Sequence, residues 1–182
     1  MRFSATGLEL LKSSEGFRSH IYMDAAGLPT IGYGHKLQNP HAYPNGITEA
    51  DTTRLLHEDL QTAIDAIDRM VKVPLNQGQF DALVDFVFNL GSERLYRSTL
   101  LRALNGGRYQ AASEQLLRWD LIAGQESEGL RARRLAELAL WTAPADAPKP
   151  APEAKPASRP ESKSIASIHA CVEDAATNSE AA

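Results

Sequence analysis

Apolar residues recur at intervals of three and four along most of this chain, a pattern typical of amphipathic helices packed on a common core. The first such stretch covers residues 4–20, with Ser4 or Thr6 as the capping residue at its start. Gly16 is expected to end the helix, because glycine readily adopts the backbone conformation that follows a last helical turn. Glu15 is therefore predicted at the C-terminal end of this helix.

A longer helix is predicted from Thr48, which with Asp51 resembles a capping box, to the region before Pro74. A helix of this length, set between residues 20–47 and the apolar remainder, is expected to join two lobes with a cleft between them. Its apolar stripe comprises Leu56, Leu60, Ala63, Ile64, Ile67, Met70 and Val71, and its solvated face is predicted at Asp59, Asp65 and Asp68.

The segment from Asn76 to Gly91 is apolar nearly all round, which places it at the centre of a helical lobe. Its polar stripe consists of Asp81, Asp85 and Asn89. Shorter helices are predicted at 98–104, 109–119 and 130–141, the last with a buried side formed by Leu130, Leu135, Leu138 and Trp141.

Residues 22–34 predict a β-hairpin whose turn is the small-residue segment 25–27. Alternation along the second strand places Thr30, Gly32 and Gly34 on one face, and Ile31, Tyr33 and His35 on the other. One hydroxyl and two missing side chains would leave a shallow floor on which a ligand can approach the backbone. The alternative is that the two glycines only mark a bend in the strand.

Glu15 and Asp24 are two acids in different settings, one at a helix end and one on a hairpin. Cleavage of a glycosidic bond uses such a pair: one protonated acid donates to the leaving oxygen, while an ionised one directs the attacking water or stabilises the developing cation. The pair with Thr30 therefore forms the candidate catalytic set.

Composition excludes several other functions. The 182 residues carry a formal charge of −4, which argues against nucleic acid as the main partner because phosphate binding needs a concentrated basic surface. The single cysteine, Cys171, permits no intramolecular disulfide, and no apolar run is long enough to span a membrane. His35, His41 and His57 match no metal-binding spacing, so structural roles are predicted for them.

The composition changes abruptly after Ala143, where six of the ten prolines lie. We expect a compact domain over residues 1–143 and a Pro/Ala-rich disordered tail over 144–182.

Glu15, Asp24 and Thr30, separated by eight and five residues, resemble the catalytic signature of the phage-type lysozymes, glycoside hydrolase family 24. Four further blocks agree in the family's order, namely the TIGYGH run, FNLG at 88–91, STLLR at 98–102 and GLxxRR at 129–134. The resemblance covers about residues 4–141 and implies an α+β, lysozyme-like fold.

The resemblance also implies an activity and a set of roles. The substrate would be the β-1,4 bond between N-acetylmuramic acid and N-acetylglucosamine in peptidoglycan, cleaved with inversion by Glu15 as acid and by Asp24 and Thr30 as water-positioning groups. Gly32, Gly34 and Arg131 are the candidate substrate-binding residues, the two glycines because of the shallow floor that they would leave on the strand. An arginine of the last helix would lie near the catalytic glutamate, with Arg131 the first choice and Arg134 the second.

No cofactor and no metal is needed for this chemistry. We expect a monomer that does not insert stably into membranes, is made in the host cytoplasm, and acts on the cell wall after holin-dependent release. Two alternatives remain open: a lytic transglycosylase that uses Glu15 alone, and a non-catalytic wall-binding module that kept the fold and lost the chemistry.

Overall fold

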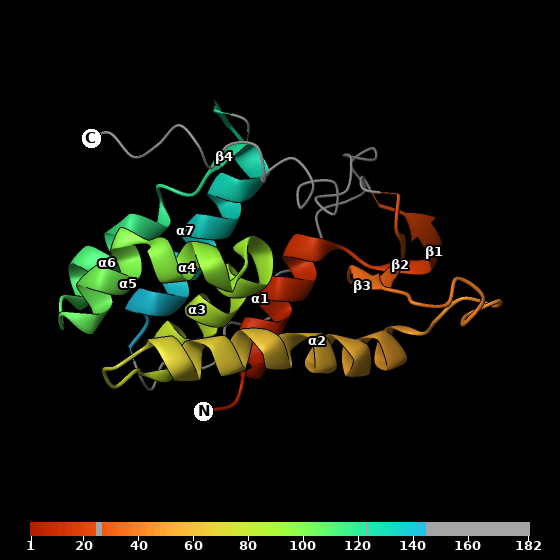
Figure 1. Cartoon of the computed structure of the whole chain (residues 1–182), viewed down its shortest axis with the longest axis horizontal. Helices are drawn as coiled ribbons and strands as arrows, with labels where there is room; N and C mark the ends of the chain where they lie inside the picture. Colours follow the sequence, from red (N-terminus) through yellow and green to blue (C-terminus); the bar gives the residue numbers. More distant parts are fainter. Residues whose placement is uncertain (25–26, 123, 145–182) are drawn as a thin grey trace.

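The computed structural model describes residues 1–24, 27–122 and 124–144. It confirms the α+β prediction: a small antiparallel sheet and a group of helices are joined by one long helix, α2 (Figure 1). The predicted tail lies, apart from Pro144, outside the described residues, so its disorder stays a prediction. None of the helices in the described ranges is long and apolar enough to cross a membrane.

Helix α1 (Ala5–Glu15) begins and ends at the predicted signals. The Ser4 hydroxyl accepts a hydrogen bond from the Gly7 amide at 3.1 Å, and Gly16 follows the last turn with φ of 72°. The predicted stretch to residue 20 is not all helical: α1 ends at Glu15, and β1 (Arg18–Met23) starts two residues after Gly16. Glu15 is thus the last helical residue before the sheet.

The sheet has the order β1-β2-β3, with all neighbours antiparallel. Strand β2 (Pro29–Gly32) pairs with β1 so that Thr30 lies opposite Tyr22. The prediction of one strand through residue 34 is wrong: the chain turns at 33–34 and returns as β3 (His35–Lys36). The hairpin turn at 25–26 lies outside the described residues.

Helix α2 (Glu49–Met70) serves both lobes, as predicted. The Thr48 side chain caps it by accepting from the Asp51 amide, and the helix ends before Pro74. Near its start, Leu55 packs with Ile31 and Ile47 in the small core beneath the sheet. Farther along, its apolar stripe enters the main core through Leu56, Leu60, Ala63, Ala66 and Ile67.

Asp59 of α2 is more than part of a solvated face. Its carboxylate lies 2.9 Å from Nδ1 of His35 on β3 and links the helix to the edge of the sheet. The turn before β3 is tied to the same helix, because the Tyr33 hydroxyl donates to Glu49 at 2.8 Å. These contacts hold the sheet against the first turns of α2.

Helix α3 (Gln77–Leu90) lies at the centre of the helical lobe, in contact with α1, α2, α4 and α7. Asn76 and Gln79 form the capping box that the sequence predicts. The remaining elements of the described chain are α4 (Ser92–Arg97), α5 (Thr99–Asn105), α6 (Tyr109–Leu116), the short hairpin β4 (Leu121–Ile122) and β5 (Gln125–Glu126), and α7 (Glu128–Thr142).

The buried side of α7 differs from the prediction. Leu130 and Trp141 are buried, but Leu135 is 50% exposed. The positions between them on the buried face are occupied by Arg133, Arg134 and Glu137. The polar stripe of α3 is buried as well, so charged side chains of α3 and α7 meet inside the helical lobe.

Candidate active site

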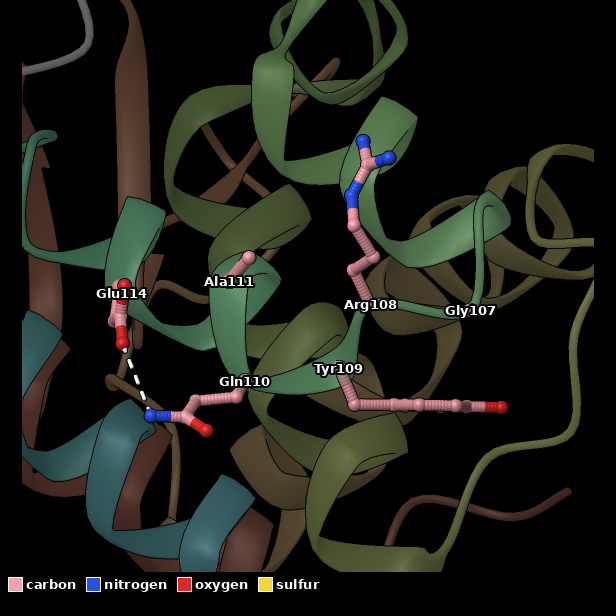
Figure 2. A pocket seen from close by; sticks show the side chains of 6 residues that line it. All are labelled: Gly107, Arg108, Tyr109, Gln110, Ala111 and Glu114. Atoms are coloured by element: carbon pink, nitrogen blue, oxygen red, sulfur yellow. Dashed lines mark hydrogen bonds between the residues drawn. The ribbon is translucent and has the colours of Figure 1, made fainter.

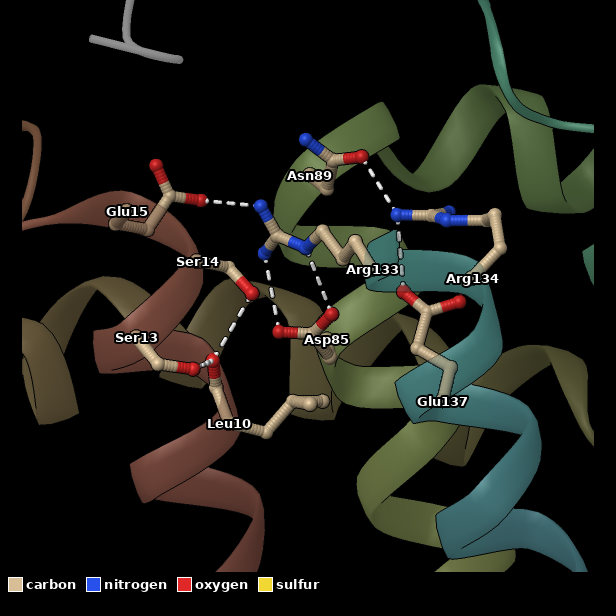
Figure 3. Close-up of polar contacts among 9 residues, drawn as sticks. All are labelled: Leu10, Ser13, Ser14, Glu15, Asp85, Asn89, Arg133, Arg134 and Glu137. Atoms are coloured by element: carbon tan, nitrogen blue, oxygen red, sulfur yellow. Dashed lines mark hydrogen bonds and ion pairs between the residues drawn. The ribbon is translucent and has the colours of Figure 1, made fainter. Parts of the chain in front are cut away.

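Glu15 is nearly enclosed at the end of α1, with 5% of its side chain exposed. One carboxylate oxygen, Oε1, accepts a hydrogen bond from Nη1 of Arg133 at 2.7 Å. Figure 3 shows the second oxygen directed away from this guanidinium. The carboxyl group is therefore held in place through one oxygen, while the other points elsewhere.

Arg133 reaches Glu15 from α7 and is itself held by α3. Its Nε and Nη2 donate to the two oxygens of Asp85 at 2.8 and 3.0 Å, the fork geometry in which a guanidinium and a carboxylate match best (Figure 3). Burial alone would raise the pKa of Asp85, but the adjacent Arg133 outweighs it and the pKa is lowered. One buried cation thus connects α1, α3 and α7.

The sequence-based choice of arginine was wrong. The Arg131 side chain is 60% exposed, and its nearest acid is Glu126 of β5, at 3.9 Å. Arg134, the second choice, points to the far side of the cluster and donates to Asn89 at 2.7 Å. The helical period indicates both Arg133 and Arg134, because a face that buries Leu130 and Trp141 also buries the positions three or four residues apart between them. Only the contacts of α7 with α1 and α3 show which of the two arginines meets Glu15.

A second layer of charge lies behind Arg133. Arg134 is 2.9 Å from Glu137, and both side chains are fully buried. Burial raises the pKa of Glu137 well above its ordinary value even though Arg134 opposes this, and burial lowers the pKa of Arg134. Nε and Nη1 of Arg134 have no hydrogen-bond partner within the described chain, and the guanidinium lies 5.1 Å from the Phe86 ring centroid.

Asp24 directly follows β1 and is held by its own turn. Its Oδ1 accepts from the Leu28 amide at 2.8 Å, and its amide donates to the Leu28 carbonyl at 3.0 Å. Lys36 Nζ of β3 lies 3.9 Å from Oδ2, and 7% of the Asp24 side chain is exposed. The contacts from Leu28 fix the carboxylate within a few residues of chain.

Thr30 is 2% exposed, and its hydroxyl donates to the Leu28 carbonyl at 3.0 Å. Because the hydrogen is used there, the oxygen lone pairs remain as acceptors. Leu28 therefore holds both Asp24 and Thr30 through its backbone, which brings these two side chains to one end of the hairpin.

Tyr22, which sequence reasoning missed, lies near both acids. It pairs with Thr30 across the sheet and stacks beneath the guanidinium of Arg18, whose Cζ is 4.8 Å from the ring centroid. Its pKa is raised mainly by burial, which Arg18 opposes, while the charges of Glu15 and Asp24 both add to the increase. Both carboxylates are thus close enough to act on one phenol.

The predicted common face of Thr30, Gly32 and Gly34 is wrong. A Cβ on Gly32 would lie 2.1 Å from Cγ2 of Thr52, so the side-chain direction of this position faces α2. Gly34 has φ of 90° in the turn before β3, and a Cβ added there would meet no atom of the described residues within 4 Å. Gly32 thus packs closely against α2 and Gly34 lies in the turn, and the contact of either residue with substrate stays a prediction.

The hollow of about 520 Å³ shown in Figure 2 is a different place. It lies beside the start of α6 and is lined by Gly107, Arg108, Tyr109, Gln110, Ala111 and Glu114. None of the candidate catalytic residues lines it, and Gln110 and Glu114 in its wall hydrogen-bond to each other at 3.3 Å. The chemistry-bearing residues lie instead at the junction of α1, the hairpin and α7.

Comparison with known proteins identifies the family to which this chain belongs. The sequence model of the family described as Phage lysozyme matches residues 12–137. The endolysin of Salmonella phage P22 is 44% identical over 144 residues, which are 78% of this chain and 98% of that protein. The SAR-endolysin of Escherichia phage Mu is 41% identical over 120 residues, which are 66% and 69% of the two chains.

A solved structure agrees with the fold. A crystal structure of a P22 lysozyme mutant superposes with a TM-score of 0.72 at 43% identity, covering 79% of this chain and 99% of that one. The α+β arrangement of sheet, long helix and helical lobe is therefore that of a lysozyme.

Proposed function

Because this chain belongs to the phage lysozyme family of peptidoglycan-degrading glycoside hydrolases, we propose that it hydrolyses the β-1,4 bond between N-acetylmuramic acid and N-acetylglucosamine. In this proposal Glu15 is the general acid, and Asp24 with Thr30 positions the attacking water. No cofactor or metal takes part. The enzyme acts as a monomer on the host cell wall.

The observation that carries the proposal is the environment of Glu15. Its carboxyl group is buried, one oxygen is hydrogen-bonded to Arg133, and the other points away from that arginine. A general acid must present a proton to the leaving oxygen at hydrogen-bond distance and in a constant direction. The Arg133 contact supplies the constant direction. The oxygen that points away from Arg133 is the one that would carry and donate the proton.

The hairpin supports the second role. The oxygens of Asp24 accept hydrogen bonds, and the Thr30 hydroxyl, whose hydrogen is given to Leu28, also has lone pairs to offer. A water held by two acceptors directs its own lone pair outward, toward the anomeric carbon of a bound sugar. Attack from the face opposite Glu15 is single displacement with inversion, for which the two carboxyl groups stand about 6.5–9.5 Å apart.

A substitution at position 15 tests the acid. Glu15→Gln keeps the shape and removes the titrating proton, so lysis of permeabilised cell walls in a turbidity assay should fall at least about 100-fold. Glu9→Gln is the matched control, because Glu9 is exposed on the same helix. Unchanged lysis by the Glu15 variant would defeat the assignment, and so would equal losses in both variants.

The products distinguish hydrolysis from the transglycosylase alternative. Hydrolysis adds one water and releases a reducing sugar, whereas transglycosylation leaves a 1,6-anhydro end that is lighter by one water. Mass spectrometry of digested peptidoglycan should find the hydrated product, and proton NMR of the first turnover should find the α-anomer that inversion forms. Anhydro products would replace this proposal with the alternative.

Access to the wall is a separate part of the proposal. We expect release through a membrane lesion made by a holin, so expression in a bacterial host should cause lysis only when a holin is co-expressed or the membrane is permeabilised. Lysis without either would assign the release step to this chain itself.

A further inference from the structure

One guanidinium serves two carboxylates at the candidate site. Asp85 takes Nε and Nη2 of Arg133, and Glu15 takes Nη1. The side chains of Arg133 and Asp85 are 1% and 0% exposed, and that of Glu15 is 5% exposed. The three groups therefore interact with little screening by water.

We propose that Asp85 is a positioning residue of the catalytic centre, which holds Arg133 in place and balances its charge so that Glu15 can carry the proton needed for catalysis. The proposal rests on the role of Glu15 as general acid given above. Asp85 acts through Arg133 and makes no contact of its own with substrate.

Charge counting gives the reason. With Asp85 ionised, its charge and that of Arg133 cancel, so a protonated Glu15 leaves the three groups neutral and an ionised one leaves a buried negative charge. With a neutral residue in place of Asp85, the opposite holds: the protonated acid would leave a buried positive charge, and the ionised form would be neutral. Because uncompensated buried charge is costly, removing the charge of Asp85 is expected to favour the ionised form of Glu15 over the protonated one.

The other groups around the cluster fit this arrangement. From α7, Asp85 faces Arg133, Arg134 and Glu137, and Arg133 is the strongest of these influences in keeping the pKa of Asp85 low against the effect of burial. Arg134 is engaged by Glu137 at 2.9 Å and by Asn89 at 2.7 Å.

On the other side, Glu15 faces Tyr22 of β1, which also lies near Arg18 and Asp24. These groups stay the same in a variant at position 85. Glu137 is the group that does respond, because Asp85 helps to raise its pKa, so a change that follows substitution at position 85 reports the charge of Asp85 together with the response of Glu137.

Asp85→Asn tests the proposal because it preserves the shape and removes the charge. The alkaline limb of the pH profile of kcat/KM on purified peptidoglycan should move to lower pH by about one unit or more, the size of effect that one close charge produces. Activity on the alkaline side then falls about tenfold or more, while activity at the acidic end is kept. Asp85→Glu, which restores the charge, should return the limb toward that of the wild type.

Asp81→Asn is the matched control. Asp81 lies one turn earlier on α3, is 1% exposed, and binds Ser4 and Gln77 instead of Arg133. The same substitution should lower stability there and leave the alkaline limb in place. If Asp85→Asn does not fold, Asp85→Ser provides the same test, because its smaller neutral side chain leaves room for water beside the guanidinium.

The outcomes separate this inference from the proposed function. A limb that stays in place or moves to higher pH in the neutral variants overturns the role of Asp85, and so does an equal movement in Asp81→Asn. If the wild-type protein releases no muropeptides, or if Glu15→Gln keeps full activity, the proposed function fails instead.

Discussion

Glu15 and Asp24 are both nearly buried carboxylates, with side chains 5% and 7% exposed, but they are held by contacts of very different range. The partner of Glu15 lies 118 positions along the chain, whereas the Leu28 amide that binds Asp24 lies four positions away. The acid half of the site thus depends on the packing of three helices, and the water half on one turn. Substitutions in the acid half should therefore lower the stability of the fold, whereas substitutions in the water half should lower activity with little loss of stability.

Loss of Arg133 should have the largest effect. Arg133→Met leaves Asp85 and Glu15 buried without their cation, which should lower the free energy of unfolding by about 3–5 kcal/mol. Arg131→Met is the control, since that exposed side chain should change it by less than about 0.5 kcal/mol. Guanidinium denaturation measures both, and similar losses would contradict the distinction between the two arginines.

Asp24→Asn should instead reduce activity with little loss of stability. The amide oxygen can still accept from Leu28, so the free energy of unfolding should change by less than about 1 kcal/mol. Without the negative charge of Asp24 beside the attacking water, kcat/KM should fall about 100-fold or more. Thermal unfolding and muropeptide release give the two values. If Asp24→Asn loses as much stability as Arg133→Met, the contacts of Asp24 contribute to the stability of the fold as strongly as those of Arg133.

Gly32→Ala should produce an intermediate effect confined to the sheet lobe. The new methyl group would overlap Thr52, and φ of 67° is unfavourable for alanine, so a loss of about 2–3 kcal/mol is expected. Gly34→Ala meets only the backbone strain and should lose about 1 kcal/mol. Adding Thr52→Ala to the first variant should recover part of the loss in urea denaturation. No recovery would mean that strain alone accounts for it.

Glu137→Gln should remove a pH dependence that belongs to the helical half. Burial raises the pKa of Glu137 in the folded protein, so the folded state keeps its proton while the unfolded chain releases it above its ordinary pKa. Wild-type stability should therefore fall as pH rises from about 4.5 toward the folded pKa, by up to about 1.4 kcal/mol per unit.

The glutamine variant lacks this slope, so its stability relative to wild type should improve with rising pH. Glu128→Gln, an exposed substitution on the same helix, should keep the slope of the wild type. Denaturation series between pH 4 and pH 8 compare the three proteins. Parallel curves for all of them would mean that Glu137 ionises in the folded protein as it does in the unfolded chain.

The comparison of the two halves also explains which predictions from the sequence were confirmed. The start of α1 at Ser4, its end at Gly16 and the cap of α2 at Thr48 were predicted, because each is set by hydrogen bonds within a few residues. The division of the glycine-rich strand at residues 33–34 was missed. Period-2 alternation does not reveal that Gly32 packs on Thr52, a contact made across twenty positions of the chain.

The sequence by itself determined most of the helices, the family, and the spacing of Glu15, Asp24 and Thr30, because caps, apolar periodicity and motif spacing are local properties of the chain. Only the tertiary structure decided which arginine meets Glu15. Two positions along a helix are about 200° apart around its axis, so burying Leu130 and Trp141 turns Arg131 to solvent and Arg133 inward. That rotation is set by the fit of α7 against α3 and α1, which no local signal contains.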